Sequence, residues 1–462
     1  MVTTMRIPVL AALAAIALCT ADLTAQRRGR FQRGGGEGPA QPPAVPRAEP
    51  QPGDSKKPKT HLAVVGGDVY LGTGQRITGA TVLVGDDKIV AVGHNLELPE
   101  GTKIIDAKGL SVSPGFVCVV GNGMGQGRGS PWIDSVNPFD PEIKQALAAG
   151  ITSYLAGAVG GGNAPGGDTA VLKTAWGSVT GMVLAEGTVY GMNAQLGAAD
   201  RERFNDLVKK VKDYRKAVAE YPAKKAADAS LKAPELPQGG DRILRVLEGQ
   251  ARLWLQLGGG GFSPFGGRRI GASNDLGGIR AAMEIAEQLG TGVVLQKPMS
   301  AWLCADEIAS TGSMAVLCPR DHVPADPSDP DHTGSNLASA ALLAAAGVPV
   351  AVTCPVGGYG GGPGVTTGGI MGQDLNTPHL DAAFAVRGGL DNRKALRTLT
   401  LDAAKILGVE HRIGSLEAGK DADILILDGD PLHYRTFVQL AIVNGKVVYE
   451  KDKEPFYSHI HR

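Results

Sequence analysis

The side chains best suited to acid–base or metal chemistry are concentrated in one segment, residues 320–332. Its sequence, R-D-H-V-P-A-D-P-S-D-P-D-H, contains two Asp-His pairs, Asp321–His322 and Asp331–His332. Imidazole and carboxylate groups this close along the chain can bind a metal ion or exchange protons with a substrate. The segment is also rich in proline and aspartate, which is typical of a solvated loop, and that second interpretation is favoured.

Histidine positions limit the chemistry elsewhere. The chain has nine histidines, and none lies between His94 and His322. The segment between these two residues therefore supplies no imidazole ligand for a metal ion. Without such ligands, it cannot hold a metal-bound hydroxide of the kind that many hydrolases use as the nucleophile.

Two motifs carry a family resemblance. Residues 110–125 read L-S-V-S-P-G-F-V-C-V-V-G-N-G-M-G, and residues 414–423 read G-S-L-E-A-G-K-D-A-D. The first resembles the opening strand of the amidohydrolase superfamily, P-G-F-I-D-x-H-x-H, and the second resembles the closing signature of that superfamily. The resemblance extends from His61 to Glu450 and looks nearest to the imidazolonepropionase-like branch.

The resemblance implies metal ligands that this sequence lacks. The family's ligand positions fall on other residue types, namely Val120, Asn122, Gln256, Gln296 and Pro355, and the aspartate of the opening motif falls on Cys118. Valine cannot bind a metal, and a neutral amide is a poor ligand for transition metals, so no metal cofactor is expected. Lys173 would suit a carboxylated bridging lysine, but an ordinary lysine is favoured.

The resemblance also implies the fold class, which is α/β. It combines a (β/α)8 TIM-like barrel with a small composite β-sandwich built from N- and C-terminal segments. Strand and helix patterns alternate between residues 117 and 407, which is typical of a parallel sheet and favours the barrel. The expected segments are a signal peptide (1–25), a disordered Gly/Pro/Arg-rich linker (26–60), the first part of the sandwich (61–113), the barrel (114–410), the second part of the sandwich (411–455) and a tail (456–462).

Apolar runs and turn residues predict the individual elements. A small antiparallel sheet is expected from strands at 62–65, 81–84, 89–92 and 104–105, with 424–427 and a hairpin at 441–449. The barrel strands are expected at 117–120, 151–155, 253–257, 292–295, 314–317 and 348–353. Helices are expected at 138–149, 201–221, 275–289, 300–309, 335–346, 381–388 and 392–407, with an exposed insertion at 222–240.

Glycine-rich segments follow several predicted strands. Of the 66 glycines, many lie in segments 121–129, 157–167, 258–267 and 357–369. Glycine would let backbone N–H groups approach a ligand closely. The favoured alternative is that these segments fill a lost site or fold over the barrel mouth, because flexible glycine costs entropy when no ligand orders it.

Composition and the N-terminus indicate an exported protein. Lysine plus arginine and aspartate plus glutamate both total 46, so net charge is zero and a nucleic-acid partner is not expected. Arg6 precedes a short apolar run that ends at Leu18, as in a secretory signal, and Ala25 precedes a suitable cleavage point. A membrane anchor is the alternative. The expected location is the periplasm or the extracellular space, without a transmembrane span after cleavage.

Four cysteines follow the predicted signal: Cys118, Cys304, Cys318 and Cys354. Their spacing matches no zinc pattern. Disulfides between Cys304 and Cys318 or between Cys118 and Cys354 are open alternatives to four buried thiols, because the pairing depends on geometry.

The favoured function is non-catalytic. We expect an exported, metal-free, amidohydrolase-like protein that binds an unidentified small molecule or assembles, as a homo-oligomer or with an active amidohydrolase relative. The alternative is a hydrolase of non-peptide C–N bonds in cyclic amides or dipeptide-like substrates. It would use an altered site with Asp321, His322, Asp331 and His332 as the candidates and zinc or iron as the cofactor.

Overall fold

The computed structural model describes residues 59–125, 127, 129–257, 275–321, 323–354, 365–366, 378–455 and 457–461. All of them belong to one compact unit, Pro58–Arg462. The other unit, Met1–Lys57, contains the predicted signal peptide and most of the predicted linker and lies outside the described residues. In the described part of the chain, no helix is both long enough and apolar enough to cross a membrane.

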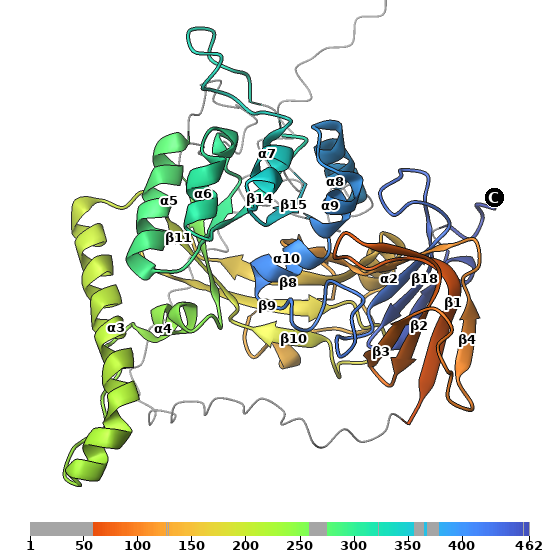
Figure 1. Cartoon of the computed structure of the whole chain (residues 1–462), viewed down its shortest axis with the longest axis horizontal. Helices are drawn as coiled ribbons and strands as arrows, with labels where there is room; N and C mark the ends of the chain where they lie inside the picture. The colour runs from red at the N-terminus through yellow and green to blue at the C-terminus, as the bar shows by residue number, and fades with distance from the viewer. Residues whose placement is uncertain are drawn as a thin grey trace, which may run out of the picture. The chain divides into compact units, whose positions relative to one another are not determined.

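An eight-stranded sheet joins strands from both ends of this unit (Figure 1). Its strand order is β19-β18-β17-β5-β1-β2-β3, and β4 pairs with β1. The bounds are β1 (His61–Tyr70), β2 (Arg76–Gly85), β3 (Lys88–Gly93), β4 (Lys103–Asp106), β5 (Ser111–Pro114), β17 (Ile424–Leu427), β18 (Val438–Val443) and β19 (Lys446–Glu450). The antiparallel pairing of β17 with β5 brings the two ends of the unit together and buries an aliphatic core.

The predicted all-antiparallel pairing of this sheet is wrong in one respect, because β4 and β5 run parallel to β1. Tight hairpins connect β1 to β2 and β2 to β3, and they reverse the chain twice. After these two reversals β3 runs in the same direction as β1. Residues 94–102 form a crossover connection between β3 and β4, so β4 also runs parallel to β1.

The other main strands form two further sheets. One has the order β10-β9-β8-β6, with β6 (Phe116–Cys118), β8 (Ile151–Val159), β9 (Gly167–Lys173) and β10 (Val183–Glu186). The second is parallel and has the order β11-β12-β13-β14-β15, with β11 (Val189–Asn193), β12 (Arg252–Gln256), β13 (Val294–Gln296), β14 (Met314–Leu317) and β15 (Val350–Val352). The fold is therefore mixed α/β, and the predicted closed (β/α)8 barrel is not confirmed, because strand pairing is not continuous.

The strict β/α alternation also fails at one place. β8 continues directly into β9 as an antiparallel hairpin, where the alternation predicts a helix. Two short strands, β7 (Gly121–Asn122) and β16 (Val365–Thr366), pair separately in parallel.

Helices cover the outer faces of the parallel strands (Figure 1). Their bounds are α2 (Pro141–Ala148), α3 (Ala198–Ala227), α4 (Asp241–Leu247), α5 (Leu276–Leu289), α6 (Ala305–Ser310), α7 (Ser339–Ala345), α8 (Pro378–Arg387), α9 (Asn392–Arg397) and α10 (Leu401–Leu407), with single 3-10 turns at Trp132–Asp134, Ala301–Leu303 and Lys451–Lys453. α3 runs through Pro222, so the predicted exposed insertion begins as helix. The predicted helix 392–407 is two helices separated at Thr398–Thr400.

The break between α9 and α10 connects the two barrel-like sheets. The Thr398 carbonyl accepts a hydrogen bond from the Val352 amide, and the Leu399 carbonyl accepts one from the Val117 amide. A continuous helix would use these carbonyls internally, so backbone pairing with β15 and β6 accounts for the interruption.

Alternate side chains of the strands point to opposite faces and therefore form two cores. One core lies under the helices. The other is shared by residues from eight strands and is closed at one end by α10. Its strand residues are Val117, Leu155, Val171, Val189, Trp254, Val294, Val316 and Ala351. In the parallel strands β11 to β15 the carboxyl ends lie at one edge of the sheet, and interior-facing residues there define a candidate site.

A buried charge cluster joins the eight-stranded sheet to the β8–β9 hairpin. Lys173, the last residue of β9, is completely buried. Its Nζ lies 2.7 Å from Asp421 Oδ2, 2.9 Å from Asp423 Oδ2 and 2.7 Å from Asn444 Oδ1. Arg412 donates two further hydrogen bonds to Asp421, at 3.0 and 2.7 Å. Lys173 is thus an ordinary structural lysine that holds two buried carboxylates.

Replacing this lysine should be costly. Lys173→Met should lower the free energy of unfolding by about 3–5 kcal/mol, because it leaves buried carboxylates with less compensating charge. Chemical denaturation of the full chain measures the change. The matched control Lys446→Met, at an exposed lysine, should change stability by less than about 0.5 kcal/mol. Equal effects of the two substitutions would contradict a structural role for Lys173.

The same cluster should make stability depend on pH. Burial alone would raise the pKa of Asp421, but hydrogen bonds from Arg412, Lys173 and Lys88 hold that pKa well below its usual range. A carboxyl whose pKa is lower in the folded state contributes stability that is fully present above its unfolded pKa of about 3.9 and is lost as the pH falls below it. Melting temperatures between about pH 6 and 2 should therefore fall more steeply for the unchanged chain than for Asp421→Asn. Parallel curves would contradict this assignment.

Candidate functional site

The candidate site starts from a row of amide side chains at the ends of three neighbouring strands. Asn193, Gln256 and Gln296 are the last residues of β11, β12 and β13, and they lie side by side in the strand register. All three are half-buried. Gln256 and Gln296 lie two residues beyond the core residues Trp254 and Val294, and Asn193 lies four residues beyond Val189, so strand alternation places all three on the interior face. Two of them, Gln256 and Gln296, are positions where the family resemblance implies histidine.

This donor set suits polar recognition and does not fit a catalytic metal. A primary amide offers one acceptor oxygen and two N–H donors and carries no charge. It can hydrogen-bond a carbonyl, an amide or a hydroxyl group of a ligand. It is a poor ligand for zinc or iron, which favour imidazole, thiolate and carboxylate groups. Among the described residues, no three His, Cys, Asp or Glu side chains are grouped so that they could hold a metal ion.

The other family ligand positions lie on different elements. Val120 is half-buried just after β6 and packs against the interior core. Asn122 ends β7, whose backbone pairs with β16. Pro355 lies outside the described residues. Val120 thus contributes apolar surface to the interior core.

The tip of the β8–β9 hairpin, residues 160–166, covers part of the row of amide side chains. Gly166 and Gly191 exchange backbone hydrogen bonds of 3.0 and 2.8 Å, and the Asn193 amide donates to the Gly162 carbonyl at 2.8 Å. The Asn193 side chain donates to Asn163 Oδ1 at 3.0 Å. A Cβ added at Gly161 would lie 2.9 Å from the Gln256 amide, so the tip backbone rests on that side chain. For segment 157–167 this cover corresponds to the favoured alternative, in which a glycine-rich segment folds over the strand ends.

Glycine at position 191 is required for this cover. A Cβ on Gly191 would lie 2.1 Å from the Gly160 carbonyl oxygen, whereas a Cβ on Gly162, in the same tip, would meet nothing within 4 Å. Gly191→Ala should therefore destabilise the chain by about 1–3 kcal/mol and expose the tip to proteolysis. Gly162→Ala, the matched control, should change stability by less than about 0.5 kcal/mol. Limited proteolysis with mass spectrometry checks both, and an undisturbed tip in Gly191→Ala would refute the contact.

All four cysteines in the described residues are buried thiols, and none is in a disulfide. Burial raises the pKa of Cys318 to about 12 and that of Cys304 to about 11. Burial also raises the pKa of Cys118 well above its usual value. Such thiols stay protonated at neutral pH and are poor nucleophiles.

The segment 320–332 forms a self-bonded loop after β14. His332 is exposed, and its Nδ1 lies 2.7 Å from Asp329 Oδ1. That hydrogen bond raises the pKa of His332. Asp331 is exposed and Asp321 is half-buried, while His322 lies outside the described residues. The partner of His332 is thus Asp329, a residue that the sequence analysis did not select.

Arg320, at the start of this loop, is tied to the helical layer. Its Nε and a terminal nitrogen donate to the two carboxylate oxygens of Asp381 in α8, at 2.9 and 3.1 Å. Asp381 is almost completely buried. This bidentate ion pair anchors the start of the loop to α8.

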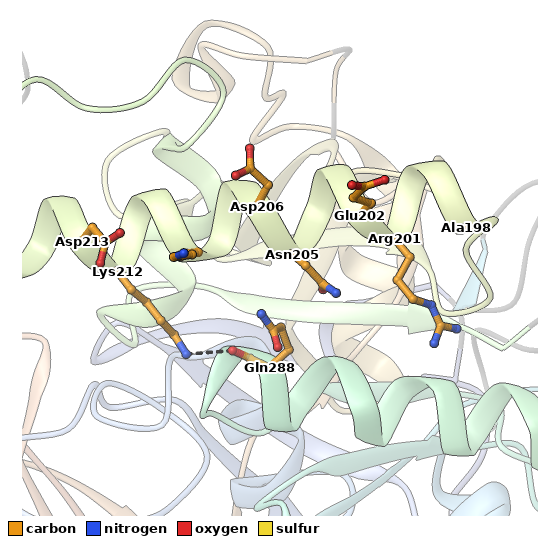
Figure 2. Close-up of a pocket in the computed structure, with 9 residues that line it drawn as sticks. Ala198, Arg201, Glu202, Asn205, Asp206, Lys212, Asp213 and Gln288 are labelled. Atoms are coloured by element: carbon orange, nitrogen blue, oxygen red, sulfur yellow. Dashed lines mark hydrogen bonds between the residues drawn. The ribbon is translucent and has the colours of Figure 1, made fainter.

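A charged groove of about 690 Å³ lies between α3 and α5 and includes none of the strand-end residues. It is lined by Ala198, Arg201, Glu202, Asn205, Asp206, Lys209, Lys212, Asp213 and Gln288. Figure 2 shows Lys212 reaching across to Gln288, whose carbonyl accepts its hydrogen bond at 2.7 Å, while Asp206 points away from the groove. The groove therefore lies along a polar contact between two surface helices, α3 and α5.

Sequence reasoning missed Asn193, because β11 carries no strong strand pattern and no family ligand position falls on it. Gln296, at the end of β13, was identified from the sequence. Only the structure shows that Lys297 has φ +49°, in the left-handed region.

Comparison with known proteins supports the amidohydrolase superfamily. A family model described as "Amidohydrolase family" matches residues 307–449, less than half of the chain. The chain is 37% identical over 71 residues to a 5-methylthioadenosine/S-adenosylhomocysteine deaminase from Symbiobacterium thermophilum, a match that covers 12% of this chain and 16% of the deaminase. It is 33% identical over 94 residues to human N-acetylglucosamine-6-phosphate deacetylase, covering 20% of this chain and 21% of the deacetylase. The chain thus spans at most about a fifth of the length of these curated relatives.

A solved structure extends the likeness of fold. An amidohydrolase from Thermotoga maritima MSB8 superposes with a TM-score of 0.58 at 24% identity, covering 84% of this chain and 100% of that chain. This likeness concerns the fold alone.

Proposed function

We propose that this chain is an exported amidohydrolase-like protein whose strand-end site binds a small polar ligand without metal-assisted hydrolysis. The observation that carries the proposal is the row of Asn193, Gln256 and Gln296 in strand register. Neutral amides stand where the family resemblance implies imidazoles, so the site keeps hydrogen-bonding capacity without strong metal ligands. Assembly with itself or with an active relative is part of this proposal.

The hairpin tip supports a binding role over a catalytic one. It covers Asn193 and Gln256 with backbone from Gly161 and Gly162 and leaves less room at this side of the strand ends. Less room at this side of the strand ends favours a small ligand over a large substrate.

A second candidate is a hydrolase of non-peptide C–N bonds with an altered site. The match of residues 307–449 to the amidohydrolase family favours it, as does the similarity to a deaminase and a deacetylase. Its acid–base residues would come from the loop with Asp321 and His332, and zinc or iron would be its metal.

Metal content tests the first candidate. The full chain, purified without chelators, should contain less than about 0.1 zinc, iron or manganese per chain by elemental mass spectrometry, because amides hold these ions weakly. Zinc should leave its melting temperature unchanged, whereas a Val120→His/Asn122→His/Gln256→His/Gln296→His variant should gain zinc-dependent stabilisation. Stoichiometric metal in the unchanged chain would overturn the proposal.

Hydrolysis assays separate the two candidates. The unchanged chain, with and without added zinc, is tested on N-acetylated amino sugars, cyclic amides and dipeptides. Turnover that disappears in both Asp321→Asn and His332→Gln establishes the second candidate. Lack of turnover together with lack of metal supports the first.

A further inference from the structure

A second cavity lies between the eight-stranded sheet and the helices, and we refer to it as the aromatic cavity. Its volume is about 160 Å³, and none of the described residues that line it belongs to the amide row. The lining comes from separate parts of the chain. Phe116 is the first residue of β6, His379 lies in the first turn of α8, Phe437 precedes β18, and Tyr457 lies near the C-terminus.

Aromatic rings are enriched in the walls of this cavity. Four of the eleven described lining residues are Phe or Tyr, although Phe, Tyr and Trp together make up only 5% of the chain. The rings of Phe437 and Tyr457 lie with their centroids 5.1 Å apart and their planes tilted by 53°. Tilted and offset pairs are favourable arrangements of aromatic rings, so a further planar ring can pack against the same walls.

The polar side chains of the aromatic cavity are uncharged at neutral pH. No Asp, Glu, Lys or Arg is among the described residues that line it. His379 is half-buried, and burial together with the nearby His433 lowers its pKa to about 4. The neutral imidazole offers one N–H donor and one acceptor nitrogen, and the Thr436 hydroxyl adds a second hydrogen-bonding group. This lining favours a neutral ligand, because an ion without a charged partner would lose its hydration there.

Tyr434 forms the solvent-facing wall of the cavity. It is 72% exposed, and its ring stacks on His433 with the centroids 4.9 Å apart. The segment 428–437 that carries it is fixed at its ends, because Asp428 Oδ1 accepts a hydrogen bond from the Phe437 amide at 2.7 Å. The cavity therefore meets the solvent beside Tyr434 and has a wall that exists before any ligand binds, as small-molecule sites usually do.

The volume of the cavity matches one aromatic ring. An engineered apolar cavity of about 150 Å³ holds benzene, so the aromatic cavity has room for a single ring with a small substituent. We propose that it is a binding site for a neutral aromatic molecule of the size of phenol. The ring packs against the aromatic walls, and the polar substituent hydrogen-bonds to His379 or Thr436. This inference does not depend on the proposed function, because the two sites share no residue. Its structural alternative is a cavity that holds only water.

The test compares two probes of similar size that differ in aromaticity. Phenol is aromatic and cyclohexanol is its saturated counterpart, and both carry one hydroxyl group. Each is titrated to about 10 mM against the full chain, with binding followed by calorimetry and melting temperature, because a ligand this small is expected to bind in the millimolar range. The unchanged chain should bind phenol saturably, melt about 1–2 °C higher with it, and bind cyclohexanol at least about threefold more weakly.

Two substitutions in the lining locate the bound phenol. Tyr434→Ala removes the exposed wall, and Ala149→Leu fills part of the cavity from the end of α2. Each should weaken phenol binding at least about threefold. Tyr434→Ala should melt within about 1 °C of the unchanged chain, because its ring is mostly exposed, and it remains informative if Ala149→Leu fails to fold.

Phe139→Ala is the matched control for loss of an exposed aromatic ring. Phe139 is 62% exposed and pairs edge-on with Trp176, and neither residue lines the cavity. This variant should bind phenol like the unchanged chain.

Three results would overturn the inference. They are no saturable binding of phenol by the unchanged chain, equal binding of phenol and cyclohexanol, or unchanged phenol binding by every lining variant that folds. The first would identify a cavity that holds only water, and the last would place phenol elsewhere on the chain. Selective phenol binding that the lining variants weaken and Phe139→Ala leaves unchanged supports the aromatic cavity as its site.

Discussion

The buried ammonium of Lys173 is the contact on which the arrangement of the other parts depends. It lies at the end of β9 and contacts Asp421, Asp423 and Asn444 from the opposite end of the chain. An unpaired charge in that position would be strongly unfavourable, so the eight-stranded sheet and the β8–β9 hairpin have to meet there. The direction of β9 then carries the hairpin tip to the strand ends of β11 and β12.

The candidate site is a consequence of that geometry together with strand periodicity. Because side chains alternate, the residues that fill the interior core also determine which residues face the site at the strand ends. At the ends of β12 and β13, the residues that face the site are Gln256 and Gln296, which carry amide side chains. The hairpin tip covers Asn193 and Gln256 with glycine backbone. The chemistry that the amide row offers is hydrogen bonding.

Thiols and acidic loops contribute less to this chemistry than their residue types suggest. The thiols of Cys118, Cys304 and Cys318 have raised pKa values because they are buried, which removes them as nucleophiles at neutral pH. His332 forms an exposed pair with Asp329, and Asp381 neutralises Arg320 within the structure. Each of these groups already has a structural environment that accounts for it.

The sequence by itself determined the mixed α/β character, most strand and helix positions and the loss of histidine at the family ligand positions, because these follow from local periodicity and residue type. It could not determine that β4 and β5 run parallel to β1, that the helix expected at 392–407 breaks at Thr398–Thr400, or that Lys173 is buried among distant carboxylates. Those features depend on pairings between residues far apart in the chain. The left-handed backbone of Lys297 belongs to the same class, since no residue pattern predicts a lysine with positive φ.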